Sequence, residues 1–255
     1  MKPDRRPYLL PALAFSTLIL VWSVIALLGD WGTHVFPSPA AVAASLWQLT
    51  LDGTLLQHTV ASLFRVTVGF YLAILLGIPL GILLGRWTSA RQFINPVIHF
   101  LRPISPLAWI PLAMLWLGIG DPPAIFLIFL ASFFPLAVST TIAVTTIQPT
   151  YFQVAANFNF SRFETMTLVI LPAITPAVVT ALRISINIAW LVVVAAEMIA
   201  VKSGLGYLIL DSRNALRMDM VMAGMIVIGV IGLLLDMMMK RLSRLESTLW
   251  AVYSR

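Results

Sequence analysis

Residues 63–84 read LFRVTVGFYLAILLGIPLGILL, and this stretch decides the class of fold. Arg65 is the only charged side chain in it. A helix of about 20 apolar residues crosses the roughly 30 Å hydrocarbon core of a bilayer. The stretch therefore predicts a transmembrane helix.

Similar apolar runs recur along the whole chain. Hydrophobic residues make up 60% of the sequence, charged residues 10%, and the mean hydropathy is +0.97, whereas soluble domains are roughly a quarter charged. We expect an all-α integral membrane protein, with one transmembrane domain over residues 1–255 and about six helices. The expected spans are residues 9–28, 63–84, 97–117, 124–144, 178–199 and 221–239.

The first run, residues 9–28, has two interpretations. It follows basic residues, as a signal peptide does. However, the run is longer than the usual signal core of about 7–15 residues, and no small-residue cleavage site follows it. We therefore interpret it as the first membrane helix.

The third run, residues 97–117, contains Pro103, Pro106 and Pro111. Proline removes a backbone donor and clashes with the preceding turn, so it breaks or kinks a helix. A break at membrane depth persists only where protein or a water-filled cavity satisfies the freed carbonyls. The sequence predicts an interrupted helix here, and a short helix within residues 202–218.

The basic residues indicate how the chain crosses the membrane, because Lys and Arg accumulate on the cytoplasmic side. With the N-terminus inside, the cytoplasmic segments hold Lys2, Arg5, Arg6, Arg86, Arg91, Arg102, Arg162, Lys240, Arg241, Arg244 and Arg255, and the outer loops hold Lys202, Arg213 and Arg217. We expect both termini and residues 145–176 in the cytoplasm. The net charge of +6 is thereby explained without a nucleic-acid partner.

Residues 145–176 contain a recognisable pattern. Gln153-Val-Ala155 is followed by three residues, then Asn159, nine residues, and Val169-Ile-Leu-Pro172. The pattern resembles the EAA loop of ABC importer permeases, which reads Glu-Ala-Ala, three residues, Gly, nine residues, Ile-x-Leu-Pro. Gln153, Val154 and Asn159 depart from it. Asn can replace Gly because it also adopts left-handed turn conformations.

Further motifs resemble the nitrate/sulfonate/taurine/bicarbonate branch of these permeases. They are the Phe-Pro-Ser-Pro turn at 36–39, Gly77-Ile-Pro-Leu-Gly81, the run 101–109, the run 204–209 and Gly232-Leu-Leu-Leu-Asp236. The resemblance implies a type I ABC importer permease in a bacterial inner membrane, which moves a small anion by alternating access. It also implies a second copy of the chain, two cytoplasmic ATPase subunits and an external substrate-binding protein.

The resemblance assigns a coupling role to the EAA-like segment. The chain contains no phosphate-binding Gly-x-x-x-x-Gly-Lys-Ser/Thr sequence, so we expect ATP and Mg²⁺ in the partner ATPase and no cofactor or catalysis here. Small residues can seat in a groove of the partner, and phenylalanines can anchor the contact. The coupling candidates are Gln153, Val154, Ala155, Ala156, Phe158, Asn159, Phe160, Leu171 and Pro172; an ordinary connecting loop is the alternative.

Besides Arg102 near the inner mouth of the third span, four charged residues lie within expected spans and should face protein or water, usually in pairs. Depth along the spans pairs Arg183 with Asp236 in the inner half, as a structural ion pair. It pairs Arg65 with Glu197 in the outer half. Arg65 and Glu197 are candidates for the translocation path, because an Arg could attract an anionic substrate; a structural clamp is the alternative.

Polar and aromatic residues near the middle of the spans are further candidates for the translocation path: Ser105, Trp109, Thr140, Asn187 and Trp190. Each also has a packing interpretation, since hydroxyls often satisfy themselves on their own helix. The glycines at 69, 77, 81 and 85 share one helix face, a pattern typical of close helix packing.

Two other classes of membrane protein compare with this sequence. The first is an intramembrane enzyme, but the sequence contains neither the His-Glu-x-x-His motif of a metalloprotease nor the Gly-x-Ser-x-Gly motif of a serine hydrolase. No metal site is expected. A stand-alone secondary transporter or channel would also show broken helices and buried charges. It remains the alternative function, and the sequence does not identify the substrate.

Overall fold

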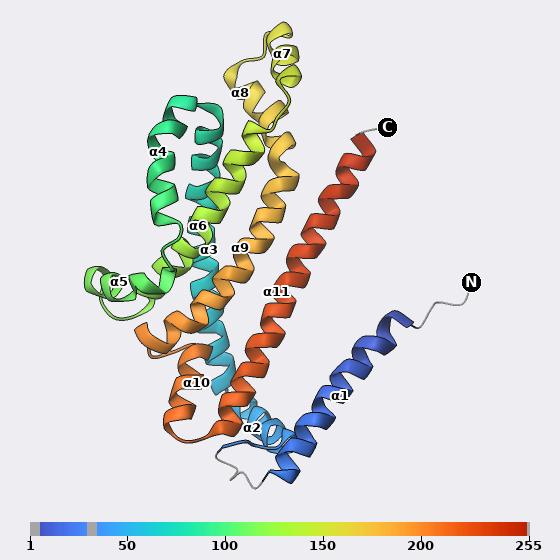
Figure 1. Cartoon of the computed structure of the whole chain (residues 1–255), viewed down its shortest axis with the longest axis vertical. Coiled ribbons are helices and arrows are strands. Elements are labelled where there is room, and N and C mark those ends of the chain that lie inside the picture. Colours follow the sequence, from blue (N-terminus) through green and yellow to red (C-terminus); the bar gives the residue numbers. More distant parts are fainter. Residues whose placement is uncertain (1–5, 30–34, 254–255) are drawn as a thin grey trace.

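The computed structural model of the chain describes residues 6–29 and 35–253, and within them helices are the only regular secondary structure (Figure 1). The all-α fold is thereby confirmed. The two chain ends, which the sequence analysis expected in the cytoplasm, lie outside the described residues.

Three long helices form the core: α3 (Thr54–Arg86), α6 (Asp121–Thr145) and α9 (Leu171–Ala200). The contact between α3 and α6 runs along the glycine row of α3, which consists of Gly69, Gly77, Gly81 and Gly85. A Cβ added at Gly81 would lie 2.5 Å from Thr140 Cβ, and one at Gly85 would lie 2.4 Å from Val144 Cβ. Such distances leave no room for a methyl group, so the expected close packing is confirmed.

The remaining long helices lie outside this core. Helix α11 (Met218–Tyr253) packs on α9 near its start and diverges from the bundle toward its end, while α1 (Arg6–Leu28) stands apart from the core (Figure 1). A short helix, α2 (Pro39–Leu51), joins them to the core. The indole of Trp22 in α1 donates a 3.1 Å hydrogen bond to the carbonyl of Pro37.

Within the described part of the chain, four helices are long and apolar enough to cross a membrane: Thr54–Arg86, Asp121–Thr145, Arg162–Ala200 and Met218–Arg241. A bent pair of helices adds a fifth candidate, and Leu13–Leu28 is a shorter apolar stretch within α1. The structure thus has an apolar helix at each expected span. The count of six membrane crossings stays a prediction.

The interruption predicted within the third span, residues 97–117, is present in the structure, but the expected start of the span differs. Helix α4 (Thr88–Leu101) begins nine positions earlier, and a break separates it from the 3₁₀ helix η1 (Pro106–Trp109) and from α5 (Ile110–Leu117). The two halves meet at 86°. Pro103 and Pro106 have no N–H to continue the helical bonds, which explains the break.

Short helices mark the two ends of the bundle. Helices α7 (Pro149–Asn157) and α8 (Arg162–Glu164) lie at one end, and α10 (Leu205–Asn214) lies at the other (Figure 1). We call these the α7 end and the α10 end. Helix α10 falls inside the segment, residues 202–218, where a short helix was expected.

Candidate functional site

Helix α7 carries the EAA-like residues on a compact projection at the α7 end. Its C-terminus closes with two bonds: Phe160 N donates to Ala155 O at 2.9 Å, and Asn159 N donates to Ala156 O at 3.0 Å. This is the Schellman arrangement, which needs a left-handed residue after the helix. Asn159 takes that conformation, with φ of 53°, as the Gly position of the pattern requires.

The outward face of this projection is apolar and aromatic. Phe158 is 72% exposed and Val154 47%, while Tyr151, which is 57% exposed, lies at the edge of this face toward α9. Among the other coupling candidates, Gln153, Ala156 and Asn159 are exposed, and Phe160 is half-buried. A surface helix normally turns such side chains inward, so this face is suited to a partner protein.

Ala155 corrects part of the expectation. It is only 3% exposed and, with Phe152 and Phe160, lines a cavity between α7 and the end of α3. The alanine therefore packs inside the protomer, whereas Ala156 is exposed.

The link from α7 to the membrane helix is wound unusually. Ser161 and Glu164 form a capping box, with Ser161 N donating to Glu164 Oε2 at 2.7 Å and Glu164 N to Ser161 Oγ at 3.2 Å. A π-helical segment, η2 (Thr165–Ile170), follows and runs into α9 at Leu171 and Pro172. Pro172 cannot donate to the carbonyl four residues earlier, which favours this wider winding.

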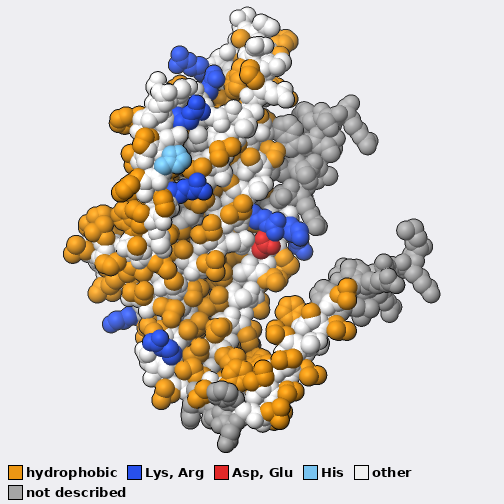
Figure 2. All heavy atoms as spheres, viewed as in Figure 1, with side chains coloured by type: hydrophobic (Ala, Val, Ile, Leu, Met, Phe, Trp, Pro, Cys, Tyr) orange, Lys and Arg blue, Asp and Glu red, His pale blue; other side chains and the backbone are white. Residues whose placement is uncertain are grey.

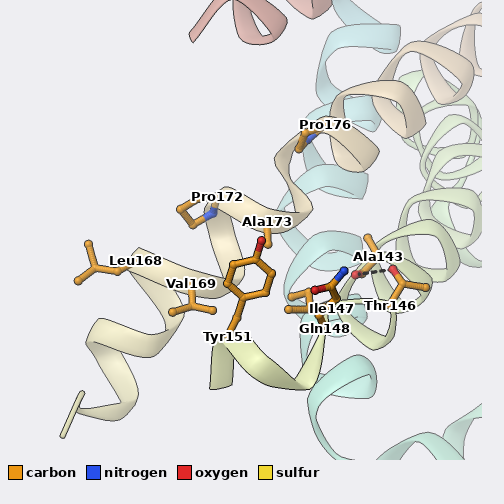
Figure 3. Close-up of a pocket in the computed structure, with 10 residues that line it drawn as sticks. All are labelled: Ala143, Thr146, Ile147, Gln148, Tyr151, Leu168, Val169, Pro172, Ala173 and Pro176. Carbon is orange, nitrogen blue, oxygen red and sulfur yellow. Dashed lines mark hydrogen bonds between the residues drawn. The ribbon is translucent and has the colours of Figure 1, made fainter. Parts of the chain in front are cut away.

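A cavity of about 470 Å³ lies between α7, the end of α6 and the start of α9. Figure 3 shows the ring of Tyr151 standing between Pro172 and Ile147, with its hydroxyl on the side of Ala173. Thr146 donates to the carbonyl of Ala143 at 3.0 Å along the same wall. The cavity leaves α7 free of close packing on this side.

At the α10 end, Arg65 is the centre of a buried polar cluster. Its Nη1 lies 2.6 Å from Glu197 Oε1 and 2.9 Å from the carbonyl of Ser203, and its Nε lies 2.7 Å from Asp121 Oδ1. Nη2 also donates to Ser203 Oγ. Ser62 donates to Glu197 Oε2 at 2.8 Å. The cluster joins α3, α6 and α9 to the loop before α10.

Two glycines make room for this cluster. A Cβ at Gly204, whose φ is +102°, would lie 2.2 Å from the Glu197 carboxyl carbon, and a Cβ at Gly206 would lie 2.2 Å from the carbonyl of Val194. Gly206 N donates to Glu197 Oε2 at 3.0 Å. The Gly204-Leu-Gly206 motif thus lets the backbone reach a buried carboxylate.

The structure also brings Arg183 and Asp236 together, across α9 and α11. Two bonds join them: Nε to Oδ1 at 2.7 Å and Nη2 to Oδ2 at 3.0 Å. Asn187 Nδ2 lies 3.5 Å from the same Oδ1. The side chains are 38% and 36% exposed in the protomer, so this pair is less enclosed than the one between Arg65 and Glu197.

The remaining candidates for the translocation path do not gather at one place. Ser105 is exposed at the break after α4, and Trp109 packs against α6 and α9. Thr140 is fully buried beside Gly81. Trp190 is buried and donates to the carbonyl of Ile228 at 3.0 Å. Thr140 and Trp190 therefore pack helices together in the protomer.

Sequence reasoning missed three members of the cluster around Arg65: Asp121, Ser203 and Ser62. Ser62 lies three positions before Arg65, on the same helix face, and that spacing was the available signal. Asp121 lies just before the expected span at residues 124–144, so it was not among the charged residues considered within spans. Among the described residues, no group of three or more His, Cys, Asp or Glu side chains gathers to hold a metal.

Long apolar helices, an interrupted span and an exposed helix beyond the spans are the features of a multi-pass membrane protein. Residues 77–246 match the family described as the binding-protein-dependent transport system inner membrane component. The chain belongs to this family of inner-membrane permeases.

Its relatives agree with that assignment. The chain is 36% identical to the taurine transport system permease protein TauC of Escherichia coli, over 90% of this chain and 85% of that one. It is 35% identical to the putative aliphatic sulfonates transport permease protein SsuC of Bacillus subtilis, over 95% and 89%. It is 34% identical to the nitrate import permease protein NrtB of Synechocystis, over 89% and 84%. The nitrate/sulfonate/taurine branch is thereby confirmed.

The fold matches a solved structure of the MetNI methionine ABC transporter in inward-facing conformations. The TM-score is 0.66 at 17% identity, over 77% of this chain and 98% of that one. The type I importer permease fold is confirmed by this match.

Proposed function

We propose that this chain is the permease subunit of an ATP-driven importer, and that it moves a small anion inward by alternating access. The relatives named for taurine, aliphatic sulfonates and nitrate share anionic groups of similar chemistry: a sulfonate or a nitrate. They support a small oxyanion as the transported class. The chain itself would carry out no chemical reaction.

The observation that carries this proposal is the exposed face of α7. Tyr151, Val154 and Phe158 are exposed on a short helix that projects beyond the long helices (Figure 1), and aromatic side chains are frequent anchors of protein interfaces. A cytoplasmic ATPase would seat on this face. The capping box and η2 would then pass its movement to α9.

The assembly would contain a second copy of the chain, two ATPase subunits that hold ATP and Mg²⁺, and an external substrate-binding protein at the α10 end. The α7 end would then face the cytoplasm, which agrees with the positions of Arg86, Arg91 and Arg162 at that end. The exposed apolar surface of the described helices would lie in lipid and against the second copy.

The test is co-purification with the ATPase encoded beside this chain, followed by uptake assays in proteoliposomes that contain the binding protein. Phe158→Asp places a charge in the proposed contact and removes an aromatic anchor, which costs about 2 kcal/mol or more, or at least about 30-fold in affinity. We expect loss of the ATPase and of ATP-dependent uptake, with normal insertion.

Trp47→Asp is the matched control, because Trp47 is an aromatic residue with 66% exposure near the α10 end. This variant should retain the ATPase. Full ATPase retention and uptake with Phe158→Asp would contradict the docking role of α7. Anion uptake by the purified chain alone, without ATPase or ATP, would favour the secondary transporter or channel instead.

A further inference from the structure

Helix α4 has two contrasting faces. Phe93, Val97 and Phe100 form an apolar row with exposures of 83%, 54% and 74%. Arg91, Asn95 and His99 form a polar row at spacings of four, which places them on one face of a helix. Figure 2 shows Lys, Arg and His side chains gathered over α4.

The polar row lines a groove, whereas the apolar row faces away from the core. Arg91, Asn95 and His99, together with Ile98, line one wall of a cavity of about 210 Å³, whose opposite wall is formed by α6 residues Val138, Thr141, Ile142 and Thr145. An amphipathic helix on a soluble protein has the reverse arrangement. A polar face turned toward neighbouring helices is typical of a water-filled passage at membrane depth.

The groove opens toward the α7 end. A second cavity, of about 460 Å³, lies between α4, the end of α6 and α7, and is lined by Arg86, Thr88 and Gln153. Arg91 and Thr145 line both cavities. Arg91 therefore borders both spaces, so a solute that moved from the groove to the α7 end would pass this guanidinium.

The groove is electrostatically suited to an anion. Neither cavity is lined by Asp or Glu, and among the described residues the ion pairs involve Arg65, Arg183 and Arg217 but not Arg91. Arg91 is half-buried. A half-buried guanidinium with no carboxylate beside it gains stability when an anion binds.

We propose that this groove is an anion-binding station on the transport path, in which Arg91, Asn95 and His99 donate hydrogen bonds to one small monovalent oxyanion, a nitrate or a sulfonate. Guanidinium and amide groups match the paired oxygens of such anions. The volume corresponds to about seven water molecules, enough for a small anion with part of its hydration. The role in transport rests on the proposed function; anion binding does not.

The test uses the absence of cysteine from the chain. A single Asn95→Cys variant of the full chain is placed in proteoliposomes of zwitterionic lipid, and its modification by an anionic and by a cationic methanethiosulfonate is timed. The ratio of the anionic to the cationic modification rate should be at least about fivefold higher for this cysteine than for a free thiol in solution. Adding Arg91→Gln should remove the preference, and nitrate or taurine should slow the modification.

Val97→Cys is the matched control, since Val97 lies on the apolar row of the same helix. It should show no charge preference and no protection by anions. The proposal is overturned if Asn95→Cys behaves like this control, if Arg91→Gln leaves the preference unchanged, or if only added anionic lipid protects the thiol. The assay contains no ATPase, so failed docking at α7 would leave its result unaffected.

Discussion

Arg65 and Glu197 meet inside the protomer, with Arg65 Nη1 2.6 Å from Glu197 Oε1 and side-chain exposures of 2% and 0%. The pair fastens α3 to α9, and Glu197 accepts two further bonds from Ser62 and Gly206. Because the polar partners of Glu197 are all supplied by the protein, we interpret the pair as a clamp. A role in contact with substrate would require the cluster to open.

Glu197→Ala should destabilise the chain by about 3 kcal/mol, since it leaves a buried guanidinium without its main partner. Asp121→Asn is the control, because Asp121 is 50% exposed and Arg65 would keep Glu197, so the loss should be smaller, about 1 kcal/mol. Unfolding in a denaturing detergent titration measures both variants. Equal losses would mean that Glu197 is not the principal partner.

Gly204→Ala should be destabilising by at least about 2 kcal/mol, through overlap with the carboxyl group of Glu197 and an unfavourable positive φ. Gly229→Ala makes the same chemical change in α11, where an added Cβ meets nothing within 4 Å in the protomer. Folded yield and thermal stability in detergent compare them. If the two variants proved equally stable, the close approach at Gly204 would be disproved.

Arg183→Gln and Asp236→Asn should each weaken the contact between α9 and α11. Their combined effect should be smaller than the sum, with a coupling of about 1–3 kcal/mol. Both side chains are more than one-third exposed in the protomer, so single losses should remain below those at Glu197. A double-mutant cycle measures the coupling, and additive effects would exclude an energetic pair.

Membrane orientation can be tested with single cysteines. A cysteine replacing exposed Ser161 should react with an impermeant reagent only after the cytoplasmic side is opened, and one replacing exposed Asn214 should react in intact cells. Ser212 is unsuitable as an outer site because it is 5% exposed. Labelling in the opposite sense would reverse the orientation of the α7 end.

Features governed by apolar length or by helical spacing were accessible from the sequence. The span within α3 follows from hydropathy, and the glycine row from its positions on one face. Depth along the spans also paired Arg65 with Glu197 and Arg183 with Asp236, and the structure joins both pairs. These features depend on one helix, or on two helices of known direction.

Features that depend on several segments at once were not accessible. Thr88 to Gln92 is polar and lies outside the expected spans, yet it forms the first turn of α4, where Arg91 faces α6. Ala155 was expected on a surface that contacts a partner, because small residues suit close contacts. In the structure it is instead buried against other residues of its own protomer. Asp121 joins the cluster around Arg65 only because α6 begins beside it.

The π-helical segment η2 has a consequence for how lengths in this region can vary. Backbone hydrogen bonds in a π-helix join residues five positions apart, whereas those in an α-helix join residues four apart. The segment Thr165–Ile170 therefore contains roughly one residue more than an α-helix of the same length would. Each residue of an α-helix rotates the chain by about 100°. Deleting one residue within η2 would therefore return the segment to α-helical winding. Inserting one residue elsewhere in α9 would rotate α7 about the axis of α9, so that the exposed face of α7 would point in a different direction. The nine-residue spacing in the EAA-like pattern thus fixes the rotation of α7 relative to α9.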